Sequence, residues 1–328
     1  MRAFFDLNGL VLCITADDEL LLAPMLEYLG ELRIDAAPAS DFEVWLKREG
    51  EQSPPADAQL ICEGPLPNGE DSKSWVHDDA EWLNLPGKLS LAYSVKRRCA
   101  TISVTPGRES LIGSFIGTAA IRAAVNSAGW TFVHSAALRV PQSERAILLF
   151  AGSGAGKTTT ALALAVHGFG YMSDDITVLV PPQRRDDVTT IWGMPRLLRV
   201  HRFTKQLLPA IGPLLGDTWN TDDEQLLSRD TLKQVIEVCP PRPYPLGAIV
   251  YLGPRTEGPH LLNKLGKAET LTRFTALNIH RKQAGGLLDK DLIRFEAMGA
   301  AIASAMTLEL RVGRDLDSLG ERVRSALD

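Results

Sequence analysis

The first part of the chain alternates short apolar runs with polar, proline-containing stretches. This pattern is typical of short strands joined by loops. It predicts strands at residues 10–15, 59–62, 89–95 and 100–104, and a helix at 109–128. The acidic and tryptophan-bearing residues 77–82 are interpreted as a solvated loop. Residues 1–128 are therefore expected to form a smaller α+β domain of unknown role.

From residue 129 onward, strand-like apolar runs alternate with longer helical patterns, which is typical of an α/β domain. Strands are predicted at residues 130–140, 145–150, 171–180, 247–252 and 307–312, and helices at 158–167, 203–215, 224–235, 269–282, 288–306 and 316–327. A turn at residues 141–144 predicts that the first two strands form a hairpin. Residues 129–328 are expected to form one domain, a mixed sheet with helices.

A glycine-rich loop joins the apolar run that ends at Phe150 to an alanine- and leucine-rich helix. It reads Ala151-Gly-Ser-Gly-Ala-Gly-Lys-Thr-Thr. Strand, glycine loop and helix together are the context of a phosphate-binding loop. The glycines are expected to let successive N–H groups turn toward phosphate oxygens, and the positive end of the helix adds to the attraction. The consensus opens with Gly where this chain has Ala151, a small replacement that the loop is expected to tolerate.

The loop predicts a nucleoside triphosphate as ligand, with ATP and Mg²⁺ as the expected cofactors. Lys157 is expected to reach the β and γ phosphates, and the Thr158 hydroxyl to ligate Mg²⁺. The residues expected to bind the nucleotide are Gly152, Ser153, Gly154, Ala155, Gly156, Lys157, Thr158 and Thr159.

Asp174 and Asp175 lie on the strand predicted after the loop helix. One carboxylate can hold Mg²⁺, directly or through water, and the other can accept a proton from an attacking hydroxyl. The residues alone leave open which aspartate has which role. His134 lies on the strand predicted before the loop strand, where a hairpin would bring its imidazole toward the γ-phosphate.

These motifs together resemble the catalytic domain of HPr kinase/phosphorylase, in particular its divergent relatives. The resemblance rests on Val133-His134-Ser135-Ala136, on the glycine loop and on Gly170-Tyr-Met-Ser-Asp-Asp-Ile-Thr-Val-Leu, and it is strongest over residues 129–180. That family phosphorylates a serine hydroxyl on a protein, and some relatives modify ribosomally made peptides such as lasso peptide precursors.

The resemblance implies a fold like that of phosphoenolpyruvate carboxykinase. It also implies site roles, with Asp174 as the catalytic base, Asp175 on the metal side and His134 against the transferred phosphate. The bifunctional family has a Glu-x-Arg-Gly segment where this chain reads Thr190-Ile-Trp-Gly. Loss of the glutamate and arginine implies a kinase that works in one direction.

Several arginines are candidates for binding substrate or phosphate. Arg196 ends a Gly-x-Pro-Arg segment that is similar to one in the divergent relatives, and Arg199 follows it closely. Arg273 and Arg281 lie on a predicted helix, and phosphoryl transfer often needs such cationic help. A surface position without function is the expected default for each of them.

Composition narrows the range of partners. A formal net charge of -5 gives no indication of a nucleic-acid-binding surface. The four cysteines are scattered without paired spacing, which predicts neither a zinc site nor a disulfide framework. No run approaches the ~20 apolar residues of a membrane span. A cytoplasmic enzyme is expected, with no nucleic acid or membrane partner; a homo-oligomer is left open.

The function predicted from the sequence is transfer of the γ-phosphoryl group of ATP to a serine-type hydroxyl of a protein or peptide. The proposed catalytic residues are Asp174, His134 and Lys157, and the proposed metal-binding residues are Thr158 and Asp175. Two alternatives remain. One is a carboxykinase-like or small-molecule kinase on the same scaffold, and the other is a switch that hydrolyses nucleotide without an acceptor.

Overall fold

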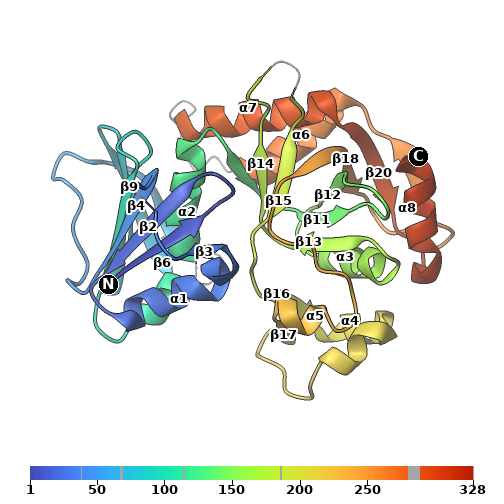
Figure 1. The fold of residues 1–328 in the computed structure, drawn as a ribbon, viewed down its shortest axis with the longest axis horizontal. Helices are drawn as coiled ribbons and strands as arrows, with labels where there is room; N and C mark the ends of the chain where they lie inside the picture. Colours follow the sequence, from blue (N-terminus) through green and yellow to red (C-terminus); the bar gives the residue numbers. More distant parts are fainter. Residues whose placement is uncertain (38, 67–68, 114, 185–186, 280–288, 328) are drawn as a thin grey trace. The chain divides into compact units, whose positions relative to one another are not determined.

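The computed structural model describes residues 1–37, 39–66, 69–113, 115–184, 187–279 and 289–327 (Figure 1). The chain divides into two compact units, one of residues 1–130 and one of residues 131–279 and 291–327. Each unit contains a mixed nine-stranded sheet with helices packed against it. The chain is therefore an α/β protein.

The sheet of the first unit has the strand order β3-β1-β2-β4-β9-β8-β7-β6-β5. Its strands are β1 (Arg2–Asp6), β2 (Val11–Ala16), β3 (Arg33–Ile34), β4 (Phe42–Lys47), β5 (Gln59–Pro65), β6 (Asp71–His77), β7 (Ala80–Leu85), β8 (Leu89–Ser94) and β9 (Cys99–Val104). The helices α1 (Glu19–Leu29) and α2 (Phe115–Ser127) pack on it. Along β4, buried and partly exposed residues alternate, as expected for a strand with one face under helices.

Four of these nine strands were predicted from the sequence. The segments at β2, β5, β8 and β9 match, whereas β1, β3, β4, β6 and β7 were not predicted. The interpretation of residues 77–82 as a loop was wrong, because His77 ends β6 and Ala80 begins β7. The chain turns back through Asp78 at a φ of 52°, a conformation that aspartate tolerates better than most residues. The predicted 109–128 helix is a 3-10 turn, Glu109–Gly113, followed by α2.

The main sheet of the second unit has the order β10-β14-β15-β18-β12-β11-β13, with β20 beside β18 and β19 beside β20. Its strands are β10 (Thr131–Val133), β11 (Ala136–Arg139), β12 (Ala146–Phe150), β13 (Gly170–Ser173), β14 (Thr177–Val180), β15 (Thr190–Gly193), β18 (Tyr244–Leu252), β19 (Leu261–Lys264) and β20 (Met306–Arg311). The strands β12, β18 and β20 run parallel, and the other pairs are antiparallel.

Helices cover both faces of this sheet. They are α3 (Lys157–Val166), α4 (Arg202–Leu207), α5 (Arg229–Leu232), α6 (Lys267–Asn278), α7 (Asp289–Ser304) and α8 (Leu319–Leu327). All five residues of β12 are buried, and their side chains alternate between two cores. Ile147 and Leu149 pack in the core that includes α3 and α8, and Leu148 and Phe150 in the core that includes α6 and α7. Burial on both faces explains the uninterrupted apolar run.

Several predicted elements of this unit need correction. The hairpin of β11 and β12 is confirmed, with Ala136 opposite Leu149. The strands predicted at 130–140 and 171–180, however, each break into two short strands. The helix predicted at 224–235 is a strand, β17 (Glu224–Leu227), followed by the single turn α5; β17 pairs with β16 (Leu198–His201) in a separate small sheet. Cross-strand pairing thus overrides the helical pattern there.

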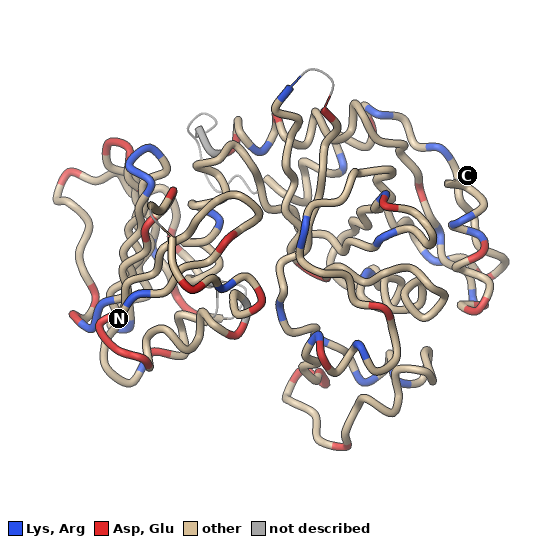
Figure 2. The backbone as a smooth tube through the Cα atoms, in the orientation of Figure 1, with Lys and Arg blue, Asp and Glu red and all other residues tan. Residues whose placement is uncertain are grey.

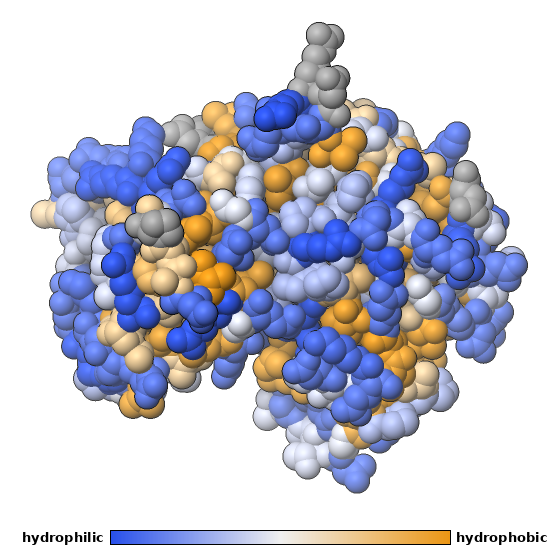
Figure 3. Space-filling model, in the orientation of Figure 1, coloured by the Kyte–Doolittle hydropathy of each residue, from blue (hydrophilic) through white to orange (hydrophobic). Residues whose placement is uncertain are grey.

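The charged residues of the chain are distributed over both units. Acidic and basic residues are interspersed along both units (Figure 2), and polar residues make up most of the face seen in Figure 3. Within the described ranges, none of the helices combines the length and the apolar character needed to cross a membrane. The four cysteines are free thiols, of which Cys13 and Cys239 are buried.

Candidate active site

The two strand breaks of the second unit lie opposite each other. The ladder of β10 and β14 ends at Val133 opposite Thr177, and the ladder of β11 and β13 resumes with Ala137 opposite Ser173. The same number of residues separates these pairs on both segments, so the register is kept across the break. The residues within the break therefore face each other.

His134 lies in this break on one segment, and Asp174 and Asp175 lie in it on the other. The sequence predicted all three on continuous strands. Because ladder hydrogen bonds are absent at a break, the side chains are free to converge on one another. His134 Nδ1 lies 2.8 Å from Asp175 Oδ1. The backbone N–H of His134 donates to Asn278 Oδ1 at 2.6 Å, a contact from the end of α6 that no sequence motif indicated.

Lys157 joins this cluster from the first residue of α3. Its Nζ lies 2.6 Å from His134 Nε2. With the Nδ1 proton directed at Asp175, Nε2 carries a lone pair and accepts from the ammonium. Burial lowers the pKa of Lys157 from its usual value, and the charges of Asp174 and Asp175 oppose that shift. The phosphate-loop lysine, the histidine and the acidic pair, all predicted as site residues, thus lie together.

Asp174 contacts the second residue of α3, Thr158. The Thr158 hydroxyl donates a hydrogen bond to Asp174 Oδ2. The other oxygen, Oδ1, is buried and has no hydrogen-bond partner among the described residues. Burial raises the pKa of Asp174, against the lowering effects of the Lys157 charge and the Thr158 hydrogen bond. The site therefore contains a buried carboxylate oxygen with unused capacity to bind a cation or a donor.

The pKa of Asp175 is shifted in the opposite direction from that of Asp174. Burial would raise its pKa, but the hydrogen bond from His134 and the nearby charges of Arg196 and Lys157 bring it down to about 2. Arg196 Nη1 lies 3.4 Å from Asp175 Oδ2. Asp175 has a φ of 74°, a left-handed conformation that costs energy for a residue other than glycine. This strained position presents a carboxylate that is 56% exposed.

Two of the three glycines in the loop have a left-handed backbone conformation. Gly154 and Gly156 have φ values of 75° and 90°. Gly152 does not, so its own conformation would accept a side chain. Ser153 is exposed, Ala155 half-buried, and Thr159 turns away to share a 3.2 Å hydrogen bond with Thr204 on α4. Gly156 is the N-cap of α3, so the loop ends at the positive end of that helix.

Gly193 is required for the packing under Asp174. A Cβ at Gly193 would lie 2.6 Å from Met172 O and 2.6 Å from Ser173 Cβ, the two residues that precede Asp174 on β13. Only glycine permits β15 to approach β13 this closely. The Gly-Met-Pro-Arg segment therefore begins with a packing residue and ends with Arg196 at the site.

A cavity of about 370 Å³ borders the glycine loop and contains residues that sequence reasoning missed. It is lined by Gly152, Gly154 and Ala155, by the end of β18, Tyr251 and Leu252, and by the residues that follow it, Gly253, Pro254 and Arg255. No motif marks Arg255. Only the pairing of β12 with β18 brings it to the loop.

The other candidate arginines lie elsewhere or are engaged. Arg199 is 70% exposed on β16 and lies 3.8 Å from Glu224. Arg273 pairs with Glu269 and Glu309. Arg281 lies outside the described residues.

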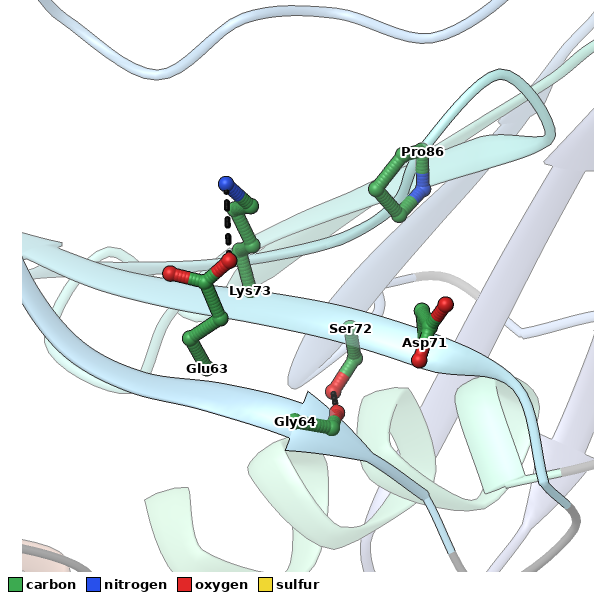
Figure 4. Close-up of a pocket in the computed structure, with 6 residues that line it drawn as sticks. All are labelled: Glu63, Gly64, Asp71, Ser72, Lys73 and Pro86. Atoms are coloured by element: carbon green, nitrogen blue, oxygen red, sulfur yellow. Dashed lines mark hydrogen bonds and ion pairs between the residues drawn. The ribbon is translucent and has the colours of Figure 1, made fainter.

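The first unit has a cavity of about 360 Å³ between β5, β6 and Pro86 (Figure 4). Two of its charged side chains pair with each other, Glu63 with Lys73 at 3.0 Å, and the Ser72 hydroxyl donates to Gly64 O at 2.9 Å. Its lining residues do not bring together a lysine, a histidine and an acidic pair, as the residues around Lys157 do.

The residues at the loop fit a magnesium ion. Mg²⁺ prefers oxygen ligands and usually shares one or two protein carboxylates with substrate phosphates and water. Thr158 Oγ1 and Asp174 are adjacent, and Asp174 Oδ1 lacks a partner among the described residues. In the described part of the chain, no three His, Cys, Asp or Glu side chains group as a metal site. A metal here would therefore depend on the nucleotide for the rest of its ligands.

No protein-family model matches this chain, and no curated protein matches it. The functional assignment therefore depends on the geometry and chemistry of the site.

Proposed function

We propose that this chain is an ATP-dependent kinase, which transfers the γ-phosphoryl group to a serine-type hydroxyl of a protein or ribosomally made peptide. The observation that carries the proposal is the cluster of contacts at the start of α3. Lys157 contacts His134, His134 contacts Asp175, and Thr158 contacts Asp174. A loop that only binds phosphate has no need of this cluster. The resemblance to the HPr kinase/phosphorylase family, with its carboxykinase-like fold, supports the same reaction.

The loop would hold the triphosphate. Backbone N–H groups from Gly152 to Thr158 and the N-terminus of α3 would face the phosphate oxygens. Lys157 would exchange its contact with His134 for one with the β and γ phosphates. Thr158 and Asp174 would hold Mg²⁺, which when bound would neutralise charge on those phosphates. Positioning and charge stabilisation supply most of the rate in such reactions.

The contacts favour a division of roles between the aspartates that differs from the one the resemblance implies. Asp174 is the carboxylate beside Thr158, so we place it on the metal side. Asp175 is the more exposed carboxylate, and His134 and Arg196 orient it. We give Asp175, with His134, the task of orienting the acceptor hydroxyl and taking its proton. A carboxylate of low pKa suffices for this, because the transition state is loose and the proton leaves late.

The alternatives differ in the acceptor. A small-molecule or carboxykinase-like kinase would use the same cluster with a smaller hydroxyl substrate. A hydrolysing switch would need only to position water. It would not need the exposed pair of His134 and Asp175, which is an argument against this alternative. The changed segment Thr190–Gly193, which lacks the family's glutamate and arginine, supports transfer in one direction only.

Substitution of Lys157 tests the proposal. Lys157→Ala should lower ATP-dependent phosphorylation by about 10²- to 10³-fold, because a cation that stabilises the transferred group is lost. Lys233→Ala is the matched control, since it removes an exposed lysine of the same unit that pairs with Asp230. The measurement is initial rate of phosphate transfer at saturating acceptor.

The same assay distinguishes the proposed roles of Asp174 and Asp175. Asp174→Asn should raise the Mg²⁺ concentration needed for half-maximal rate, and Asp175→Asn should lower kcat with ATP affinity retained. If Asp174→Asn lowers kcat at unchanged Mg²⁺ dependence, Asp174 is the base and the resemblance gives the correct roles. Full activity in Lys157→Ala would contradict the proposed function itself.

A further inference from the structure

Arg255 reaches the glycine loop because two parallel strands end at the same edge of the sheet. β12 and β18 are hydrogen-bonded neighbours, with Phe150 opposite Tyr251. The glycine loop follows β12 directly, and Gly253-Pro254-Arg255 follows β18. Ligands of such sheets bind outside the carboxyl ends of the parallel strands. Arg255 therefore belongs to the segment where the topology of the sheet puts a ligand.

The guanidinium of Arg255 lies over Gly156. Its Nη2 atom is 3.1 Å from the point that a Cβ of Gly156 would occupy, and Cζ and Nε are each 3.9 Å from it. Gly156 is the N-cap of α3 and directly precedes Lys157. The missing side chain at Gly156 thus leaves room for an arginine at the entrance to the helix N-terminus.

Arg255 is exposed, and within the described ranges it forms no ion pair or hydrogen bond. Other cations near the site differ in this respect, since Lys157 contacts His134 and Arg196 contacts Asp175. Arg255 also lines the cavity of about 370 Å³ together with Gly152, Gly154 and Ala155. An arginine with its donors free, in a cavity walled by a phosphate-binding backbone, matches the planar, multi-donor recognition of phosphate.

We propose that Arg255 binds the phosphate chain of the nucleotide at the glycine loop, beside Gly156. Lys157 and Arg255 then hold the triphosphate between them, with Lys157 directed toward the reacting cluster and Arg255 over the loop backbone. This inference rests on the proposed function, because it assigns a further residue to the same nucleotide site. Arg255 stabilises bound polyphosphate and need not touch the nucleoside.

Equilibrium binding of ATP to the full-length chain tests the inference. Arg255→Ala should weaken ATP binding by about 10- to 100-fold, the range expected for a lost charge-assisted hydrogen-bonding group. Arg255→Lys should lose less, because it keeps the charge but not the fork of donors. The control is Arg242→Ala, which lies just before the opposite end of β18 and pairs with Glu144. It should bind ATP like the wild type.

Competition by inorganic tripolyphosphate, measured on the same variants, identifies what Arg255 binds. Tripolyphosphate should lose affinity for Arg255→Ala by about the same factor as ATP. Unchanged ATP affinity in Arg255→Ala overturns the inference, and so does weaker ATP binding with unchanged tripolyphosphate competition, since Arg255 would then contact the nucleoside. Lys157→Ala is measured in parallel. Weaker ATP binding in that variant, with unchanged ATP binding in Arg255→Ala, would contradict the inference about Arg255 and leave the proposed function standing. If neither the wild type nor any variant binds ATP, the proposed function fails as well.

Discussion

At the scale of single residues, the two aspartates of the site differ in charge environment although they are neighbours in the chain. Asp174 is buried against Thr158, and its pKa is raised. Asp175 is partly exposed and faces His134 and Arg196, and its pKa falls to about 2. Neighbouring titratable groups whose pKa values are pushed apart are a common property of catalytic sites.

The low pKa of Asp175 predicts a pH-dependent contribution to stability. The folded-state pKa of about 2 lies below the ordinary value of 3.8, so the contribution is complete above about pH 4 and is lost as pH falls toward 2. The difference in free energy of unfolding between wild type and Asp175→Asn should shrink over that interval. Denaturant unfolding at about pH 6, 4 and 3 measures it. A difference that stays constant would mean that the ion pair does not stabilise the fold.

These residues were easier to predict when the residues they contact lie close to them in the sequence. The glycine loop, Lys157 and Thr158 were predictable because strand, loop and helix are contiguous. The position of His134 near the glycine loop was predicted from a hairpin, and its contact with Asp175 was not predicted. The strand breaks that allow their contact were not predicted, since apolar periodicity runs on through them.

At the scale of elements, the site depends on how closely β15 and β13 approach. Gly193 on β15 lies against Met172 and Ser173, which lead directly into Asp174. Met194 N–H also donates to Ile176 O at 3.3 Å, just beyond the acidic pair. The position of the acidic pair is therefore fixed from β15 as well as from its own strand.

Gly193→Ala should disturb this packing. The new methyl group would lie 2.6 Å from backbone and side-chain atoms of β13 that have little room to move. We expect a loss of about 1–3 kcal/mol in the free energy of unfolding, as for other overpacked cores, together with a lower rate of transfer. Gly299→Ala is the matched control.

The control should behave in the opposite way. A Cβ at Gly299, within α7, meets no atom within 4 Å. Replacement of a helical glycine with alanine stabilises by roughly 0.5–1 kcal/mol. Equal destabilisation of both variants in thermal or denaturant unfolding would show that the approach of β15 to β13 has no special importance.

The strand β12 was predictable from its uninterrupted apolar run, whereas β4, in which buried and partly exposed residues alternate, was not predicted. The parallel neighbours β12 and β18 were both predicted as strands, yet nothing in the sequence pairs two segments about one hundred residues apart. For that reason Arg255, which depends on this pairing, was not found from the sequence. The helical pattern of residues 224–235 was misleading, because β16 supplies a strand partner that only the tertiary structure provides.

At the scale of the whole molecule, the proposed chemistry lies within the second unit. The residues of the cluster, the glycine loop and the cavity around Arg255 all belong to it. The first unit has its own sheet and its own cavity, in which Glu63 pairs with Lys73 and the Ser72 hydroxyl donates to Gly64 O. An α/β organisation was predictable from alternating strand and helix patterns, whereas the order of the strands was not, because it is set by pairings between distant segments.

The fate of the γ-phosphoryl group tests the central claim most directly. The chain is incubated with Mg²⁺ and γ-labelled ATP in the presence of serine-containing peptides, and of the same peptides with alanine in place of serine. We expect label on serine in the first set, no label in the second, and transfer lowered by about 10²- to 10³-fold in Lys157→Ala. Label recovered only as free phosphate, at the same rate with and without peptide, would contradict it.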